Sequence, residues 1–392
     1  MYRATEAVTL ATTVTGSLPR PAWYTENLGR RSFIEAMVNS AFREQYIDAV
    51  SAFLRDQETA GLDICTDGDA RFDTEVGGQS WFSYALGHLG GFDRSRAPEL
   101  PRNIAGPMFP RGHILGEWIE ARLTSTLTGP VTRGELQYTA LWKTAQRLTK
   151  KPVKFGTITA ELIAQSARDE HYKDRRDRIM AVAAALNAEL TELADAGCPV
   201  IQIEEPQIHS TAVRGTNDGV ITPDFLVEVF NATVRGLRAK TEVWCHTCWG
   251  NPAQQRMYAE TPSYKAALET LNRCDADLIT FETCSSAGRD FEAIGRVITG
   301  KKIAIGVIDH HTLQVERPDE VSALIRKALP HIAAERLVVT SDCGMGREGM
   351  SRRHAFYKMV SLVEGTNTVR RELGLPEASC LAADPHFSLT SA

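Results

Sequence analysis

The chain has 392 residues, of which 43% are hydrophobic and 24% charged, and its formal net charge is −5. This composition is typical of a soluble globular protein, and the negative balance excludes a basic field that would attract nucleic acid or an anionic membrane. We expect a cytoplasmic protein, because there is no signal-peptide pattern, no apolar run near the roughly 20 residues that cross a bilayer, and no close cysteine spacing typical of secreted disulfide frameworks.

Eight short segments have the composition of β-strands that are buried on both faces. Most of them are continuously apolar rather than alternating, which is typical of parallel strands covered by helices. In chain order the predicted strands are residues 8–17, 62–69, 152–159, 199–206, 241–248, 276–283, 302–311 and 336–344.

Helical patterns lie between these strands. Apolar residues recur every three or four positions from Phe42 to Leu54, and Gly61 is well placed to end that helix. The leucines from Leu186 to Leu193 do the same before Gly197, and Pro318 is placed at a helix start. Eight strands that alternate with helices favour an α/β fold of the (β/α)8 TIM-barrel type, and the alternative is a doubly wound open sheet.

The domain organisation predicted from this pattern is a single catalytic barrel over residues 1–374. Residues 75–125 form a long insertion after the second strand, rich in glycine, arginine, proline and aromatic residues. Loops of this length are usually functional lids or disordered segments. Residues 375–392 are expected to be an irregular C-terminal extension.

Reactive side chains in such a barrel gather where the strands end at their C-termini. Seven of the eight predicted strands carry candidates at that end. In chain order they are Gly16 and Ser17, Asp67 and Asp69, Glu204 and Glu205, His246 and Cys248, Glu282, Asp309 with His310 and His311, and Asp342 and Cys343.

Four of these residues form a mixed nitrogen, sulfur and oxygen set that suits zinc: His246, Cys248, Glu282 and Cys343. Their wide separation excludes a zinc finger and requires a site that the fold assembles. Taken alone, each has a simpler explanation, such as packing near a strand end, a solvated glutamate or a small buried cysteine. We interpret them as a metal site because all four follow predicted strands.

Three anionic ligands around a dication make an electron-rich site, which activates water poorly. A thiol bound there loses its proton, and the sulfur remains a nucleophile, so alkyl transfer to sulfur is the expected reaction. His311, oriented by Asp309, is a candidate acid toward the leaving group. The alternative for this pair is a hydrogen-bonded strand end.

Seven motifs then carry a family resemblance. They are "TTVTGSLPRP", "KKPVKF", "DAGCPVIQIEEP", "CHTCWGN", "DADLITFET", "IGVIDHHTLQVERPDEV" and "LVVTSDCGMG". Their order and strand positions resemble the C-terminal catalytic barrel of cobalamin-independent methionine synthase, over roughly residues 8–365. The large N-terminal barrel of the long form has no counterpart, so the chain resembles a short, core-type member of the branch shared with epoxyalkane:coenzyme M transferase.

The resemblance implies roles for the candidate residues. His246, Cys248, Glu282 and Cys343 match the family's zinc ligands, and His311 matches its proton-donor histidine. The substrate homocysteine would be held by four residues: Gly16 and Ser17 through backbone contacts to its carboxylate, and Asp69 and Glu204 through contacts to its amino group.

The chain departs from the family pattern at several of these positions. The two amine-binding acids are typically Glu and then Asp, whereas here they are Asp69 and Glu204. On the folate side, the pterin-stacking tryptophan is replaced near Ser166, a family glutamate falls on Ser210, and the "TGP" motif is replaced by residues 158–160. The residues expected to bind the thiol therefore match the family pattern more closely than those expected to bind the methyl donor.

The leading function predicted from the sequence is zinc-dependent methyl transfer to homocysteine, which gives methionine, with a methylfolate or another compound as donor. The alternative is attack of coenzyme M on an epoxide, for which the sulfonate would need arginine contacts. Candidate arginines are Arg71, Arg94, Arg96, Arg102 and Arg111. Further alternatives are a decarboxylase-like lyase and a non-catalytic zinc- or thiol-binding protein on the same barrel. An oligomer is compatible with each of these functions.

Overall fold

The computed structural model describes residues 3–28, 31–71, 80–93, 95, 125–215, 219–250, 258, 260–346 and 350–383. Its centre is a seven-stranded sheet in the order β1-β4-β6-β7-β8-β9-β10, in which all neighbours are parallel. The strands are β1 (Cys65–Thr66), β4 (Val153–Ile158), β6 (Val200–Glu204), β7 (Glu242–His246), β8 (Leu278–Phe281), β9 (Lys302–Ile308) and β10 (Leu337–Ser341).

The chain around Thr12 closes this sheet into a ring. On one side, Thr13 N–H donates to Val339 O (3.0 Å), and Val339 N–H donates to Ala11 O (2.9 Å). On the other side, Ile64 N–H donates to Thr12 O (3.1 Å), just before β1. This segment therefore takes the eighth strand position. The predicted (β/α)8 barrel is confirmed, and the doubly wound open sheet is excluded.

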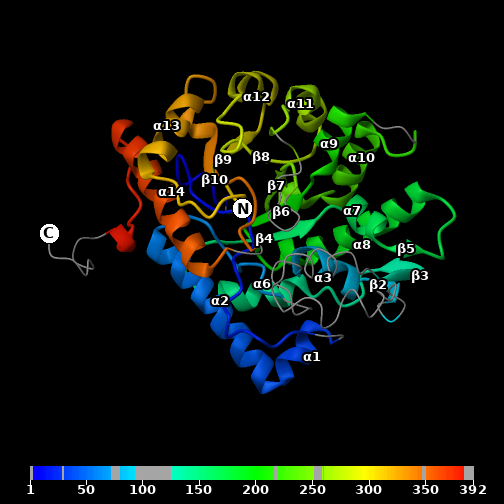
Figure 1. The fold of residues 1–392 in the computed structure, drawn as a ribbon. Coiled ribbons are helices and arrows are strands. Elements are labelled where there is room, and N and C mark those ends of the chain that lie inside the picture. The colour runs from blue at the N-terminus through cyan, green and yellow to red at the C-terminus, as the bar shows by residue number, and fades with distance from the viewer. Residues whose placement is uncertain are drawn as a thin grey trace.

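Helices surround the strands, as Figure 1 shows. They are α1 (Phe33–Val38), α2 (Ser40–Ala60), α6 (Tyr138–Gln146), α7 (Ala160–Ser166), α8 (Arg175–Asp195), α9 (Gln207–Arg214), α10 (Pro223–Thr233), α11 (Leu268–Asn272), α12 (Phe291–Val297), α13 (Pro318–Ala328) and α14 (Arg352–Glu372). Short 3-10 helices are η2 (Leu237–Ala239), η4 (Lys265–Ala267), η5 (Ala334–Arg336) and η6 (Leu381–Ala383). None of the helices in the described ranges is long and apolar enough to span a membrane.

The helix boundaries follow the local signals in the sequence. Gly61 ends α2 with a left-handed φ of 94°, a conformation that costs glycine little. Pro318 occupies the first turn of α13, where its missing N–H is not needed. Both predicted boundaries are confirmed, and α8 ends at Asp195, two residues before Gly197.

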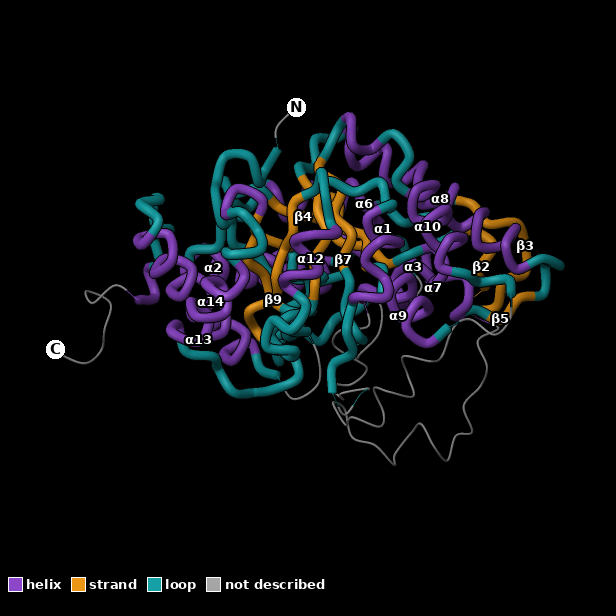
Figure 2. Tube along the Cα trace, turned by 90° about the horizontal axis from the view of Figure 1, so that it is seen from above, coloured by secondary structure: helices purple, strands orange, loops and turns teal. Residues whose placement is uncertain are grey.

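A second, small sheet lies to one side of the barrel and was not predicted. It contains β2 (Gly90–Asp93), β3 (Thr126–Thr132) and β5 (Arg168–Asp169) in the order β2-β3-β5. Figure 2 shows it apart from the barrel strands. The helix α3 (Ser80–His88) and β2 belong to the predicted insertion at 75–125, of which residues 72–79, 94 and 96–124 lie outside the described part. Of the C-terminal extension, residues 375–383 are described.

The continuous apolar character of the strands has a simple origin in the barrel. In β7, Trp244 joins a small cluster of residues from several strands, whereas Val243 and Cys245 belong to the larger core that includes the helices. Successive side chains thus alternate between the barrel interior and the helix layer. In β6 the same alternation directs Gln202 and Glu204 to the side opposite Ile201 and Ile203. The barrel interior is therefore polar toward the C-terminal ends of the strands.

Candidate metal centre and adjoining pocket

The predicted site residues lie at one rim of the barrel. Glu204 and His246 are the last residues of β6 and β7, and Glu282 directly follows β8. Asp309 directly follows β9, and Cys343 comes two residues after β10. Because all these strands are parallel, their C-terminal ends meet on the same side of the barrel.

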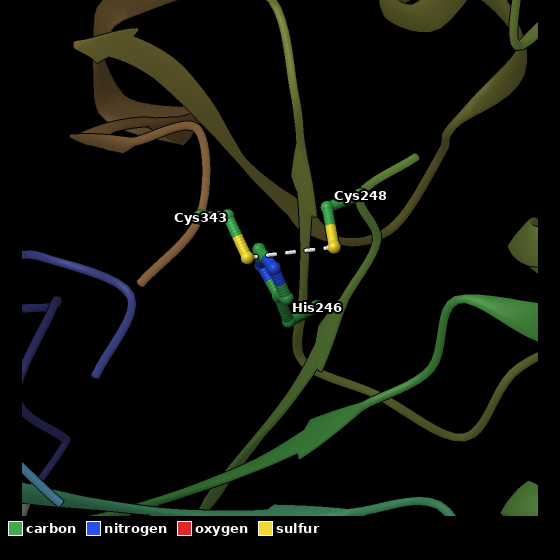
Figure 3. Close-up of side chains that lie close together, drawn as sticks. All are labelled: His246, Cys248 and Cys343. Atoms are coloured by element: carbon green, nitrogen blue, oxygen red, sulfur yellow. Dashed lines mark hydrogen bonds between the residues drawn. The ribbon is translucent and has the colours of Figure 1, made fainter. Parts of the chain in front are cut away.

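Three of the four predicted metal ligands converge at this rim. The ligand atoms of His246, Cys248 and Cys343 all lie within 4.8 Å of one another, and all three residues are buried (Figure 3). The two Sγ atoms are 3.5 Å apart. A nitrogen and two sulfurs at this spacing form a compact donor set for a metal that prefers soft ligands.

His246 has one ring nitrogen that is hydrogen-bonded and one that is not. Its Nδ1 lies 2.6 Å from Thr280 Oγ1, whereas its buried Nε2 has no hydrogen-bond partner among the described residues. Burial, followed by the nearby charge of Lys154, lowers the pKa of the ring to about 3, so the ring is neutral. A tautomer protonated at Nδ1 leaves the Nε2 lone pair available to a cation.

The two cysteines cannot both carry charge in this site without a cation. The hydrogen bond shared with Cys343, followed by burial and nearby negative charge, raises the pKa of Cys248 well above its ordinary value. A bound metal removes thiol protons, because the coordinating sulfur is a thiolate. The donor set therefore fits a dication, because a cation would offset the negative charge of the two thiolates.

Glu282, the fourth predicted ligand, does not join the three-residue cluster within 4.8 Å. Its Oε2 accepts a hydrogen bond from Trp249 N–H (2.8 Å), and its Oε1 accepts one from Ser285 Oγ (2.7 Å). Burial raises the pKa of this carboxyl group. Since Trp249 follows Cys248 directly, these contacts tie Glu282 to the ligand loop, and each carboxylate oxygen keeps a second lone pair.

The predicted substrate residues gather around Gly16. A Cβ atom at Gly16 would lie 3.0 Å from Asp69 Oδ2 and 3.8 Å from Glu204 Oε1, so only glycine leaves this space open. Gly16 and Ser17 are buried, and their backbone N–H groups donate no hydrogen bond to any described residue. Two adjacent buried N–H groups of this kind suit an anionic acceptor.

Ser17 connects this pocket to the metal cluster. Its carbonyl accepts hydrogen bonds from Met345 N–H (2.8 Å) and Gly346 N–H (3.1 Å), in the loop that follows Cys343. A Cβ at Gly344 would lie 2.2 Å from Ser17 Oγ, so the two loops are in close contact. The backbone of Gly16 and Ser17 and the loop of Cys343 therefore form one packed unit.

Arg71, one of the arginines considered for a sulfonate, is buried in internal contacts. Its Nη2 lies 3.0 Å from Asp69 Oδ1 and donates to Gly156 O (2.8 Å). Its Nη1 lies 3.6 Å from Asp67 Oδ2. The guanidinium therefore orients Asp69. The other four arginines lie outside the described residues.

His311 and Asp309 form the predicted pair. The Nδ1 of His311 lies 3.1 Å from Asp309 Oδ1, which also accepts the His311 backbone N–H (2.7 Å). Burial disfavours the charge of Asp309, but hydrogen bonds from His311 outweigh it and hold the pKa of this carboxyl group below its ordinary value. Together with His310, these residues are a second group whose possible ligand atoms lie within 4.8 Å.

Two buried polar residues near the site were missed by the sequence reasoning. His209 on α9 donates from Nε2 to Cys248 O (2.7 Å), and Lys154 lies inside the barrel on β4. The signal for Lys154 was a charged residue within a continuously apolar strand. His209 had no such signal, because its partner is a backbone carbonyl 39 positions away.

Comparisons with known proteins agree with this geometry. The family model for the catalytic domain of cobalamin-independent synthase matches residues 101–365. A methionine synthase of Saccharolobus solfataricus is 30% identical over 365 residues, which cover 93% of this chain and 96% of that protein. A 2-hydroxypropyl-CoM lyase of Xanthobacter autotrophicus is also 30% identical, over 94% of this chain and 97% of that protein.

Solved structures show the same likeness. A B12-independent methionine synthase from a Shewanella species, in complex with selenomethionine, is 26% identical with a TM-score of 0.74. The match covers 93% of this chain and 99% of that one. A structure described as a vitamin-B12-independent methionine synthase from Listeria monocytogenes, at 15% identity and a TM-score of 0.62, shares the fold.

The buried ring of His209 predicts a pH dependence of stability. Burial lowers its pKa to about 4, whereas the unfolded residue titrates near 6.5. The unfolded state therefore binds more protons as the pH falls from about 6.5 to about 4, and stability is lost over that range. The free energy of unfolding should fall between pH 7 and pH 5, and in His209→Gln this fall should be smaller by about 2 kcal/mol. Denaturant unfolding at the two pH values measures it. The exposed His171→Gln is the control, and an unchanged pH slope in His209→Gln would contradict the prediction.

Proposed function

The chain belongs to the cobalamin-independent methionine synthase family, and from that membership we propose that it is a zinc-dependent enzyme that transfers a methyl group to homocysteine. The observation that carries the proposal is the buried set of His246, Cys248 and Cys343 beside the pocket of Gly16, Asp69 and Glu204. A metal that holds sulfur and a pocket suited to an amino acid meet at one rim of the barrel.

Zinc is the metal that this donor set supports best. Structural and catalytic zinc sites use imidazole and thiolate ligands in a tetrahedral arrangement. His246 Nε2, Cys248 Sγ and Cys343 Sγ would hold the ion, and Glu282 would supply an oxygen as the fourth ligand. Bound zinc would lower the pKa of the substrate thiol and keep its sulfur as a thiolate.

The pocket residues would orient homocysteine. The N–H groups of Gly16 and Ser17 would donate to its carboxylate, and Asp69 and Glu204 would accept from its ammonium group. Arg71 fixes Asp69 from the opposite side through Oδ1, at 3.0 Å. Anchoring both charged groups leaves the thiol end as the part that reaches the metal cluster.

His311 would hold or move a proton at the leaving group. The ionised Asp309 accepts a hydrogen bond from His311 Nδ1, which fixes the orientation of the ring. A nitrogen leaving group such as that of a methylfolate requires a proton before it departs. The pair would supply it at the same rim that carries the metal ligands.

A second candidate is the opening of an epoxide by coenzyme M. The similarity to a 2-hydroxypropyl-CoM lyase favours it, because its identity to this chain equals that of the methionine synthase. Two buried carboxylates beside Gly16 favour a thiol that carries an amine, which coenzyme M lacks. Arg71, already paired with Asp67 and Asp69, provides little attraction for a sulfonate. We therefore rank homocysteine first.

Zinc binding tests the metal assignment. The protein loaded with zinc should contain about one zinc per chain, and Cys343→Ser should weaken zinc binding by more than the roughly 10- to 100-fold that loss of an outer-shell partner costs. His246→Ala should act likewise, because each variant removes a direct ligand. Competition with a chelating dye gives the affinity. Cys380→Ser, remote from the rim, is the control, and unchanged affinity in Cys343→Ser would refute the site.

The amine pocket is tested with two thiols. Glu204→Gln or Asp69→Asn should weaken homocysteine binding by about 1–3 kcal/mol, because the ammonium group loses a charged acceptor. The affinity of 4-mercaptobutyrate, which lacks the amine, should not fall. Isothermal titration of zinc-loaded protein measures both. Tight binding of coenzyme M together with unchanged homocysteine affinity would instead support the epoxide reaction.

His311 is tested by varying the leaving group. His311→Asn should lower kcat by about 10² to 10⁴ with a methylfolate or an epoxide, since general acid catalysis is typically worth this much. With a methylsulfonium donor, which departs as a neutral thioether, kcat should change little. Zinc and thiol affinities should equal those of the wild type. An equal loss with all three donors would show that His311 has a structural role.

A further inference from the structure

Three consecutive backbone carbonyls before the pocket are each held by a side chain from a different strand. They belong to Val14, Thr15 and Gly16, the segment that leads to Ser17. Lys154 Nζ donates to Val14 O (2.8 Å), and Gln202 Nε2 donates to Thr15 O (2.9 Å). Thr66 Oγ1 donates to Gly16 O (2.9 Å). The loop is therefore fixed from below by β4, β6 and β1.

Lys154 is the first member of this set and is buried inside the barrel, 1% exposed. Besides Val14 O, its Nζ donates to Gln202 Oε1 (2.8 Å), and it lies 4.7 Å from the centre of the Trp244 ring. Burial lowers its pKa to about 7, although the charges of Glu204 and Asp69 oppose this shift. An amine is costly to bury, so its retention here calls for a specific task.

Lys154 also helps to orient the amide of Gln202. A lysine amine has donors for both neighbours, so it requires an oxygen from Gln202. With Oε1 directed to Lys154, the Nε2 of Gln202 is directed to Thr15 O, as observed. Without the amine, Thr15 O alone would favour this orientation of the amide, and Gln202 Oε1 would lose its hydrogen bond from Lys154. Lys154 thus makes one of the three loop contacts and supports a second.

The N–H groups of this loop are of two kinds, those that are hydrogen-bonded and those that are not. Thr15 N–H donates to Ser341 Oγ (3.0 Å), and Leu18 N–H donates to Gly68 O (3.0 Å). Between them, the N–H groups of Gly16 and Ser17 donate to no described residue. The N–H groups of Gly16 and Ser17 therefore lie between two hydrogen-bonded N–H groups. The contacts to the carbonyls of Val14, Thr15 and Gly16 fix the same backbone.

We propose that Lys154 is a positioning residue for anion recognition: by holding Val14 O and orienting Gln202, it keeps the N–H groups of Gly16 and Ser17 directed at the carboxylate of the thiol substrate. The identity of that substrate rests on the proposed function. The loss of this support weakens the contact with the anionic end of the ligand. Removal of the Lys154 charge, which acts on Glu204 and Asp69, does not weaken the contact of these acids with an amine.

Binding of three thiols tests the proposal in zinc-loaded, full-length protein. Lys154→Met, which keeps the chain length and removes the donors, should raise the Kd of homocysteine and of 4-mercaptobutyrate by about tenfold or more, as expected for misdirected donors to a charged group. The Kd of 3-aminopropanethiol, which has no carboxylate, should not rise, because loss of a cation near Glu204 and Asp69 does not weaken their attraction for an amine, and zinc content should equal that of the wild type. In turnover assays, KM for homocysteine should rise, whereas kcat should stay close to that of the wild type. Equal weakening of all three thiols would overturn the proposal.

A second variant and a ligand-free measurement keep the test independent of the proposed function. Gln202→Leu keeps Lys154 and removes the donor to Thr15 O, so it should show the same selectivity for carboxylate ligands. In hydrogen exchange without ligand, amides of residues 14–18 should exchange about tenfold faster in Lys154→Met, and those of β8 should not change. Unchanged exchange at 14–18 would overturn the positioning role. Failure of the wild type to bind any thiol would overturn the proposed function and leave the exchange result to decide on Lys154.

Discussion

Contact between the sulfur atoms of Cys248 and Cys343, at 3.5 Å, is the interaction on which the site depends. The two residues are 95 positions apart and follow β7 and β10, which are separated in the sheet by β8 and β9. Such strands bring their ends together only when the sheet curves around. The ring closure at Thr12 therefore supports the approach of the two sulfurs as well as the stability of the barrel.

The barrel interior is divided along its axis. The lower part is filled by small and large apolar side chains around Trp244, and this cluster contributes to stability in the usual way for a packed core. The upper part carries Lys154, Gln202 and Glu204, all with little or no exposure. Polar groups at this depth must satisfy one another, so the network beneath the pocket is rigid and its donors are pre-organised for a ligand.

Much of this organisation could be predicted from local sequence signals. Continuous apolar runs marked the barrel strands, Gly61 and Pro318 marked helix ends, and residues at strand ends pointed to His246, Cys248 and Cys343. The small second sheet could not be predicted, because β2 and β5 have four and two residues and depend on pairing with β3. The hydrogen bonds that hold Glu282, and the internal pairing of Arg71, likewise arise from tertiary contacts that no local pattern contains.

The seam at Thr12 has a consequence for ligand binding. The first segment is joined to β10 by one backbone bridge at Thr12 and by the hydrogen bond from Thr15 N–H to Ser341 Oγ, whereas β6 pairs with both of its neighbours along several residues. That same segment continues directly into Gly16 and Ser17. Any anion that these N–H groups bind therefore contributes its binding free energy to this joint of the ring, by thermodynamic linkage. Ligand binding and closure of the barrel are therefore linked equilibria, so a bound ligand would stabilise the attachment of the first strand.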